Sequence, residues 1–378
     1  MKFAKTSLAA LVAMLALGTA HADITIGVVQ PLTGPASGLG IPVKNAVALW
    51  PKTIAGENLK VIVLDDASDP TTGVKDTQRL VTEDKVDVLV GSTATPVAIP
   101  MADIAAESGT PQISTAPAVL PPGKDKWMFR LPQSNAVMAV AMVNHMKKQG
   151  VKTVGFLGYT DAYGEGWLKD FTAEAAKNGI TIVGTERFAR ADTSVTAQAL
   201  KLTSANPDAI LIVASGSGAG MPEKAIMERG YKGKIYQTHA AATRDLMKTA
   251  GKDADGTFVV SGPAVIAEQL PDSHPSKKMA IAFVDSYEKA YGPGSRNQFA
   301  GHGSDALVVL EKAIPVALKK GKPGTPEFRA ALRDALENMG RTVLAHGVLD
   351  WTPTDHWGYT NETGVMLKVV NGEFKVEQ

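Results

Sequence analysis

The chain has 378 residues and an almost even charge balance, with 39 Lys and Arg against 38 Asp and Glu. So small a net charge argues against a surface that binds nucleic acid or an anionic membrane. The complete absence of Cys excludes disulfides, thiolate metal sites and a Cys nucleophile, and the 36 Gly and 22 Pro indicate a globular chain with many short loops.

Residues 1–22 have the three parts of a secretory signal peptide. Two lysines precede ten apolar residues at positions 8–17, and Ala20 and Ala22 satisfy the small-x-small rule for cleavage. The apolar run is too short to cross a bilayer, which takes about 20 helical residues. The alternative is a buried N-terminal helix. We predict export with cleavage after Ala22 and leave these residues out of the fold.

Short apolar runs rich in β-branched residues alternate with helical patterns along the first third of the chain. The expected strands are residues 24–29, 59–64, 86–90 and 111–114, and the expected helices are 41–50, 71–83 and 96–107. Such alternation predicts a parallel, doubly wound sheet.

The alternation starts again after a break near residue 134. The second series of expected strands is 153–157, 181–183, 209–214 and 234–236, and its expected helices are 135–149, 164–178, 194–204, 221–229 and 242–250. Two series predict two sheets, and therefore two α/β lobes.

The last third of the chain departs from this pattern. After a strand near 257–261, the expected elements are helices at 276–291, 304–320 and 326–338, and strands at 342–349 and 365–370. Three successive helices cannot extend the second sheet, so we expect the chain to return to the first lobe and leave it again. The predicted division is 23–134 plus 263–347 for lobe one and 135–262 plus 348–378 for lobe two, with a hinge and a cleft between them.

Motifs of enzymes and cofactor sites are absent. The seven His residues form neither H-x-x-x-H nor H-E-x-x-H, so no metal site is predicted. Ser215 and Ser217 lie in a glycine-rich run, but neither fits G-x-S-x-G. The loop at 34–40 does not fit G-x-G-x-x-G, so no nucleotide or other cofactor is predicted. Because this loop follows the first strand, we expect it to rim a ligand cleft, and a plain surface loop is the alternative.

Thr95 and Pro96 predict a helix start, with Thr95 as the N-cap and Pro96 as the first helical residue. The N–H groups of such a turn point at any anion placed beside it. An ordinary helix cap is the alternative. The small residues at 114–118 follow the next strand and leave backbone groups open to a ligand, unless they form only a proline-broken turn.

An aromatic-rich stretch at 159–167 opens a helix after the first strand of lobe two. A Tyr there can cover a ligand with both its ring and its hydroxyl, whereas we expect Trp167 to pack in the core.

Six motifs resemble the leucine/isoleucine/valine-type periplasmic binding proteins of ABC importers, over essentially the whole chain after the signal. They are I-T-I-G-V-V-Q-P-L-T-G-P at 24–35, V-L-D-D-A-S-D-P at 63–70, V-G-S-T at 90–93, F-R-L-P at 129–132, D-A-Y-G-E-G at 161–166 and the preceding signal peptide. The resemblance implies a type I periplasmic binding protein fold: two doubly wound, Rossmann-like lobes joined by three crossovers, with ligand in the cleft.

The resemblance also implies a set of ligand contacts. An ungapped match of residues 91–118 implies a ligand-binding hydroxyl at Thr95 and backbone contacts at Ala116 and Ala118. The other implied or candidate contacts are Tyr163, Leu39, Phe299, Ser215 and His239.

Two departures from the family pattern concern the ligand. Amino-acid binders of this type usually have Thr or Ser where this chain has Ala118, and a carboxylate where it has His239. Both groups normally hold the α-ammonium, and a buried ammonium without a counter-charge costs several kcal/mol. The part of the family site that binds the ligand carboxylate, at Thr95, is present in this sequence. A neutral His239 can donate or accept, a protonated one would attract an acid, and the alternative is that it faces solvent or caps the strand end.

The sequence therefore predicts a periplasmic, monomeric, non-enzymatic solute-binding protein that delivers a small carboxylate to an ABC permease. An aromatic or other hydrophobic acid is favoured over a branched-chain amino acid, and some relatives that resemble this chain take aromatic acids such as benzoates. A ligand-sensing receptor partner and, last, a secreted hydrolase are the alternatives from other classes.

Overall fold

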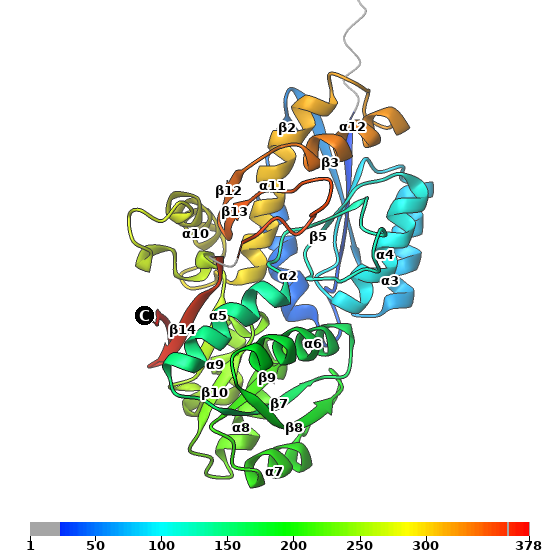
Figure 1. Cartoon of the computed structure of the whole chain (residues 1–378). Helices are drawn as coiled ribbons and strands as arrows, with labels where there is room; N and C mark the ends of the chain where they lie inside the picture. The colour runs from blue at the N-terminus through cyan, green and yellow to red at the C-terminus, as the bar shows by residue number, and fades with distance from the viewer. Residues whose placement is uncertain (1–22, 361–362, 378) are drawn as a thin grey trace, which may run out of the picture.

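The protein is described by a computed structural model that covers residues 23–360 and 363–377 (Figure 1). The predicted signal peptide and its cleavage site lie outside the described residues. None of the described helices is both long and apolar enough to span a membrane. The chain folds into two α/β lobes, each built on one sheet.

The sheet of lobe one has six strands in the order β2-β3-β1-β4-β5-β6. They are β1 (Ile24–Gln30), β2 (Thr53–Ile54), β3 (Glu57–Asp65), β4 (Val88–Gly91), β5 (Gln112–Ser114) and β6 (Met128–Arg130). All neighbours pair in parallel except β2, which is antiparallel to β3. Every residue of β4 is buried, as expected for a strand covered by helices on both faces.

Helices cover both faces of this sheet. Helices α3 (Pro70–Thr82) and α4 (Thr95–Ser108) pack together on one side, and α2 (Ser37–Val47) packs with α11 (Gln298–Ala317) on the other (Figure 1). The contact between α2 and α11 is close because a Cβ on Gly303 would lie 2.8 Å from the Ala46 Cβ atom. Helix α11 therefore packs against lobe one.

The sheet of lobe two has seven strands in the order β15-β14-β11-β10-β9-β7-β8. They are β7 (Thr153–Tyr159), β8 (Thr181–Phe188), β9 (Ala209–Val213), β10 (Lys234–Gln237), β11 (Phe258–Ser261), β14 (Val365–Val370) and β15 (Glu373–Val376). Strands β7 to β11 pair in parallel, whereas β14 and β15 add antiparallel strands at one edge. Its helices are α5 (Asn135–Lys148), α6 (Ala162–Lys177), α7 (Thr196–Ser204), α8 (Ser217–Met227) and α9 (Arg244–Ala250).

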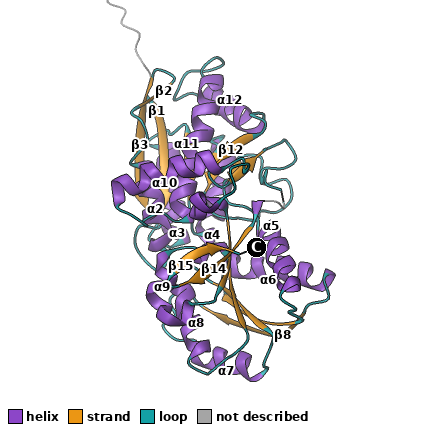
Figure 2. Cartoon of the chain, turned by 90° about the vertical axis from the view of Figure 1, so that its left-hand side faces the viewer, coloured by secondary structure: helices purple, strands orange, loops and turns teal. Residues whose placement is uncertain are grey.

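Three passages of the chain join the lobes: from β6 to α5, from β11 to α10 (Lys277–Tyr291), and from the last hairpin to β14. Figure 2 shows the two lobes from the side, with β1 and β3 in one and β8 in the other. Helix α6 also contacts α4 across the interface. The predicted two-lobe type I periplasmic binding protein fold is confirmed.

The predicted strand at 342–349 is instead a hairpin of β12 (Thr342–Leu344) and β13 (Gly347–Leu349), which follows α12 (Pro326–Glu337). The predicted lobe boundary at 347 and 348 falls inside it. Beyond the hairpin, the rings of Trp351 and His356 still pack on Phe129 of lobe one, at 5.1 and 4.2 Å between centroids. The last passage to lobe two therefore comes later than predicted, after His356.

Candidate ligand-binding site

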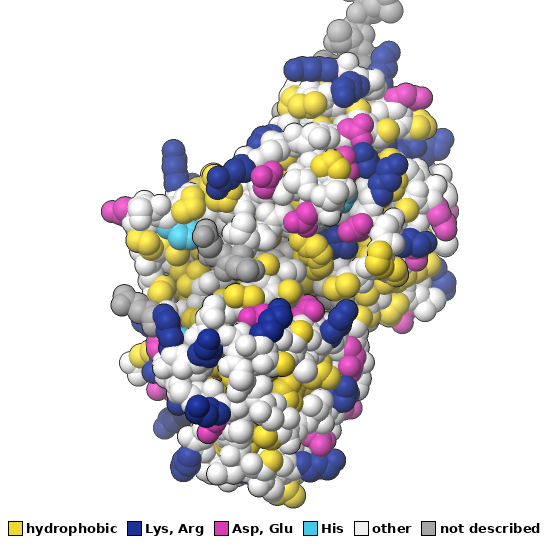
Figure 3. All heavy atoms as spheres, viewed as in Figure 1, with side chains coloured by type: hydrophobic (Ala, Val, Ile, Leu, Met, Phe, Trp, Pro, Cys, Tyr) yellow, Lys and Arg dark blue, Asp and Glu magenta, His cyan; other side chains and the backbone are white. Residues whose placement is uncertain are grey.

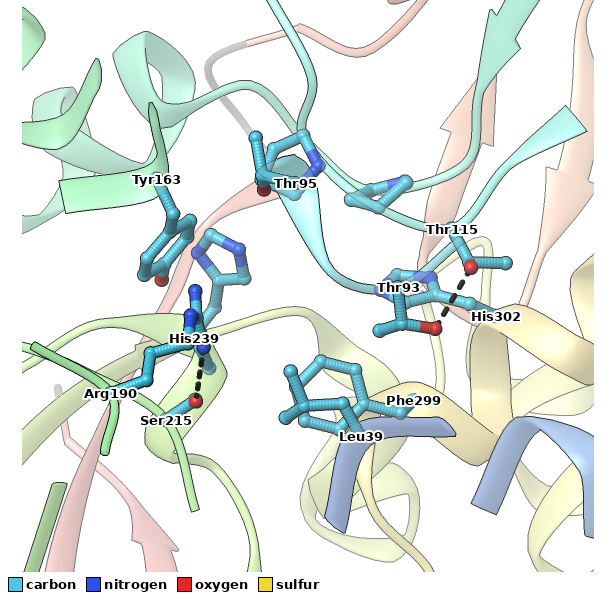
Figure 4. Close-up of a pocket in the computed structure, with 13 residues that line it drawn as sticks. Leu39, Thr93, Thr95, Thr115, Tyr163, Arg190, Ser215, His239, Phe299 and His302 are labelled. Atoms are coloured by element: carbon cyan, nitrogen blue, oxygen red, sulfur yellow. Dashed lines mark hydrogen bonds between the residues drawn. The ribbon is translucent and has the colours of Figure 1, made fainter. Parts of the chain in front are cut away.

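A small pocket lies between the lobes, with a cavity volume of only about 20 Å³. Its walls come from both lobes (Figure 4). Lobe one contributes Leu39, Thr93, Thr95, Thr115, Pro117, Pro132, Phe299 and His302, and lobe two contributes Tyr163, Arg190, Ser215, His239 and Ala240. Most of them follow the carboxyl end of a parallel strand, where open α/β sheets bind ligands.

The structure brings together six of the eight residues predicted for the site: Leu39, Thr95, Tyr163, Ser215, His239 and Phe299. Ala116 and Ala118 do not line the pocket. The Ala116 carbonyl accepts from the Ser114 hydroxyl at 2.9 Å and from the Ala118 amide at 2.8 Å, and the Ala118 carbonyl accepts from Arg130 Nε at 2.6 Å. These backbone groups already have partners within lobe one, and the implied ligand contacts at Ala116 and Ala118 stay predictions.

Thr95 is the first residue of helix α4, and Ala94, in extended conformation, is the N-cap. The predicted cap role of Thr95 is thus wrong by one residue. The amides of Val97 and Ala98 both donate to the Ala94 carbonyl at 2.9 Å. Thr95 is a buried residue at the pocket wall, and its hydroxyl has no hydrogen-bond partner among the described residues. It is therefore available to a ligand, beside a helix N-terminus that favours an anion.

Among the described residues, Arg190 is the only charged one that lines the pocket. Its Nε donates to Asp161 Oδ2, its Nη1 donates to the Ser215 hydroxyl at 3.1 Å, and its guanidinium lies 4.2 Å from the centre of the Tyr159 ring. Nη2 has no partner within the described part of the chain, so both of its protons remain available. Arg190 therefore offers a cation with free donors to an acid in the cleft.

Asp161 is closed to a ligand. Its Oδ1 caps helix α6 by accepting from the amides of Tyr163 at 2.9 Å and Gly164 at 3.2 Å, and its Oδ2 pairs with Arg190. The hydroxyl of Tyr163 is 2.7 Å from the Thr238 hydroxyl, and burial raises the pKa of Tyr163, which keeps the phenol neutral. Within residues 23–360 and 363–377, no Asp or Glu lines the pocket.

His239 is buried and lines the pocket, so the alternative that it faces solvent is wrong. Burial lowers the pKa of His239 to about 3, with a smaller contribution from His346, so its imidazole is neutral at physiological pH. Burial lowers the pKa of His302 well below its ordinary value too. The Nδ1 atoms of His239 and His302 have no hydrogen-bond partner among the described residues. Each neutral ring offers one donor and one acceptor.

A second cluster behind the pocket brings metal-ligand types together. One possible ligand atom each from His302, Asp305 and His346 lies within 4.8 Å of the others. The rings of His302 and His346 stack, however, with centroids 4.2 Å apart and planes 28° apart. The lone pairs of the two rings therefore lie in nearly parallel planes, which does not suit convergence on one metal ion at about 2.1 Å from each nitrogen. Asp305 instead holds the hairpin turn, accepting from the Ala345 amide and His346 Nδ1 at 2.8 Å.

Sequence reasoning missed several lining residues: Thr93, Thr115, Pro117, Pro132, Arg190, Ala240 and His302. Thr93 ends the V-G-S-T motif, and Thr115 and Pro117 lie in the small-residue stretch, so their signal was present. Arg190 follows β8, which runs to Phe188 and not to 183 as predicted. His302 lies in α11, which begins at Gln298 and not at 304.

A small pocket between two α/β lobes, lined by residues of both, is the arrangement of the solute-binding proteins. On the face shown in Figure 3, positive and negative side chains are interspersed over both lobes.

Residues 23–372 match the family model described as periplasmic binding protein, and the chain belongs to that family. The predicted type, that of the leucine/isoleucine/valine-binding proteins, is confirmed, and the protein is a binding protein and not an enzyme. It is 29% identical over 89% of both chains to the Leu/Ile/Val-binding protein homolog 3 of Brucella melitensis.

Solved structures agree with this membership. An extracellular ligand-binding receptor from Rhodopseudomonas palustris is 46% identical, with a TM-score of 0.92 over 94% of this chain and 99% of the other. An ABC-transporter solute-binding protein from R. palustris, solved in complex with benzoate, is 21% identical, with a TM-score of 0.78 over 94% of this chain and 95% of the other. The second likeness shows the fold alone.

Proposed function

We propose that this protein is the periplasmic binding component of an ABC importer and that its ligand is a small carboxylate without an ammonium group, an aromatic or other hydrophobic acid. The observation that carries the proposal is the lining of the pocket, which contains one cation, Arg190, and no Asp or Glu. An ammonium buried there would have no counter-charge, at a cost of several kcal/mol.

The donors of the pocket suit a carboxylate. Arg190 Nη2 keeps its protons free, and the Thr95 hydroxyl is unpartnered at the start of α4. Hydrogen bonds from charged or oriented donors to a carboxylate are the stronger kind, at about 1.5–3 kcal/mol each. Leu39, Phe299, Pro117 and Pro132 provide apolar walls for the rest of the ligand.

The relatives support a role in transport, but they do not agree on a single ligand. The Brucella relative is named for leucine, isoleucine and valine, and the more distant R. palustris protein holds benzoate. The alternative for this chain is therefore a branched-chain amino acid. In the proposed role, the protein is exported, its signal is removed after Ala22, and the monomer delivers its ligand to a permease in the inner membrane.

A thermal-shift screen tests the proposed ligand class. Benzoate, phenylacetate, 3-phenylpropanoate and branched aliphatic acids are compared with leucine, isoleucine and valine. A ligand present at 100 times its Kd stabilises the folded state by about 2.7 kcal/mol, which gives a clear rise in melting temperature. We expect the rise with one or more acids and none with the amino acids. A rise with amino acids alone would refute the proposal.

A further inference from the structure

Three side chains at the lobe-one end of the pocket form a closed ring of hydrogen bonds. The Thr93 hydroxyl donates to Gln30 Oε1, the hydroxyls of Thr93 and Thr115 are 2.9 Å apart, and Gln30 Nε2 donates to the Thr115 hydroxyl at 3.1 Å. All three residues are buried, and Thr93 and Thr115 line the pocket. Figure 4 shows the two threonines on one side of the pocket, opposite Tyr163, Arg190 and Ser215.

The direction of the protons around this ring is determined by a backbone group. The Thr93 amide also donates to Gln30 Oε1, at 3.2 Å. An N–H must meet an oxygen and not an NH₂ group, so the orientation of the Gln30 amide is settled and Nε2 faces Thr115. Because Thr115 accepts from Nε2 and Thr93 donates to Oε1, the proton between the two hydroxyls belongs to Thr115.

Each threonine has therefore used its only proton within the ring. What remains for a ligand on Thr93 and Thr115 is lone pairs, so this end of the pocket offers acceptors. The oxygens of a carboxylate placed here would face the lone pairs of the two threonine hydroxyls and would be repelled by them. His302 lines the same side and, as a neutral imidazole, adds one donor and one acceptor.

The opposite end of the pocket offers hydrogen-bond donors, because Arg190 Nη2 has unpartnered protons and no free lone pair. The pocket therefore has one donor-rich end and one acceptor-rich end, with Leu39 and Phe299 between them (Figure 4).

We infer that the ligand carries a hydroxyl group at the end opposite its carboxylate, and that this hydroxyl donates to the Thr93–Thr115 pair. A hydroxyl fits better than an ammonium because it carries no charge and can also accept from His302. The inference rests on the proposed binding of a carboxylate. It narrows the class of ligand to hydroxylated acids with an apolar middle.

Calorimetric titration of matched acids tests the inference. Benzoate, phenylacetate and 3-phenylpropanoate are each compared with their 4-hydroxy and 4-methoxy forms, so that the distance between the two polar groups varies. The methoxy group accepts but cannot donate. For the best-fitting length, we expect the hydroxy acid to bind roughly three- to tenfold more tightly than both partners, the value of one neutral hydrogen bond.

A variant of Thr115 tests whether the preference for the hydroxy acid depends on the hydrogen-bonded ring. In Thr115→Val, the hydroxy acid should lose its advantage over the unsubstituted and 4-methoxy acids. Thr115→Ser keeps a hydroxyl and should keep the advantage, which separates the loss of the group from a loss of folding. Thr77→Val, a buried hydroxyl in α3 outside the pocket, is the matched control and should change neither affinity.

The possible results separate a failure of the hydroxyl inference from a failure of the proposed carboxylate binding. Acids that bind with no hydroxyl preference at any length, or a preference that survives in Thr115→Val, would overturn the inference and leave the carboxylate function standing. Binding of leucine, with no acid of the series bound, would overturn both.

Discussion

Arg190 and Asp161 form an ion pair at the lobe-two side of the cleft, with 14% and 19% of their side chains exposed. The two partners differ in what they can offer a ligand. Both oxygens of Asp161 already accept hydrogen bonds, whereas Arg190 Nη2 has no partner. Both oxygens of Asp161 are thus engaged within lobe two, whereas Arg190 remains available to a carboxylate.

Replacing Arg190 should weaken acid binding more than it affects folding. Arg190→Gln removes a charged donor, so we expect a loss of about 1.5–3 kcal/mol in the binding free energy of the best acid. Calorimetry measures the loss. Arg187→Gln, in β8, removes an exposed arginine paired with Glu165 and is the matched control. Equal affinities for the two variants would show that Arg190 does not contact the ligand.

Thr95→Val tests the helix N-terminus. The change removes an unpartnered hydroxyl and keeps the branched shape, so the melting temperature should stay close to that of the wild type. Acid binding should fall by about 1.5–3 kcal/mol because a bond to a charged group is lost. An unchanged Kd would mean that Thr95 serves only to begin α4.

His239→Glu should shift the ligand preference. The new carboxylate would lie in the pocket, repel an acid and provide a counter-charge for an ammonium. We expect weaker binding of acids and improved binding of leucine or valine, measured by calorimetry beside the neutral variant His239→Gln. Acid affinity unaffected by His239→Glu would contradict the position that the structure gives this residue.

The buried neutral state of His239 predicts a pH dependence of stability. Its folded pKa, about 3, lies below the unfolded value near 6.5, so below pH 6.5 the unfolded chain binds a proton that the folded chain does not. Stability from this residue is therefore complete above pH 6.5 and is lost as the pH falls toward 3. Relative to His239→Gln, the wild type should lose about 2 kcal/mol of unfolding free energy between pH 6.5 and 5. Denaturant titration at both values checks this, and a constant difference would contradict it.

The sequence predicted the interiors of both sheets because strands covered on both faces are continuous apolar runs, as in β4 and β9. Elements without that signal were missed. Strand β8 is only half-buried beyond residue 183, so the apolar pattern does not predict its end at Phe188 or place Arg190, in the turn that follows, at the pocket. His302 and His346 are 44 positions apart, and only the packing of the hairpin on α11 brings their rings together.

Hinge closure should be visible in solution. Two lobes joined by three passages predict a monomer whose radius of gyration falls when the ligand binds, as small-angle scattering would record. An unchanged radius with saturating ligand, or a dimer, would contradict the proposed mode of action.

The claim that the pocket accepts a carboxylate and rejects an ammonium is tested most directly by ligands that differ in that group alone. Calorimetry of the wild-type protein should compare 4-methylpentanoate with leucine, and 3-phenylpropanoate with phenylalanine. Because the described pocket has no acid to pair with the ammonium, at least one acid should bind more tightly than its amino counterpart by tenfold or more. Tighter binding of leucine than of 4-methylpentanoate, with no binding of the aromatic acid, would contradict the account.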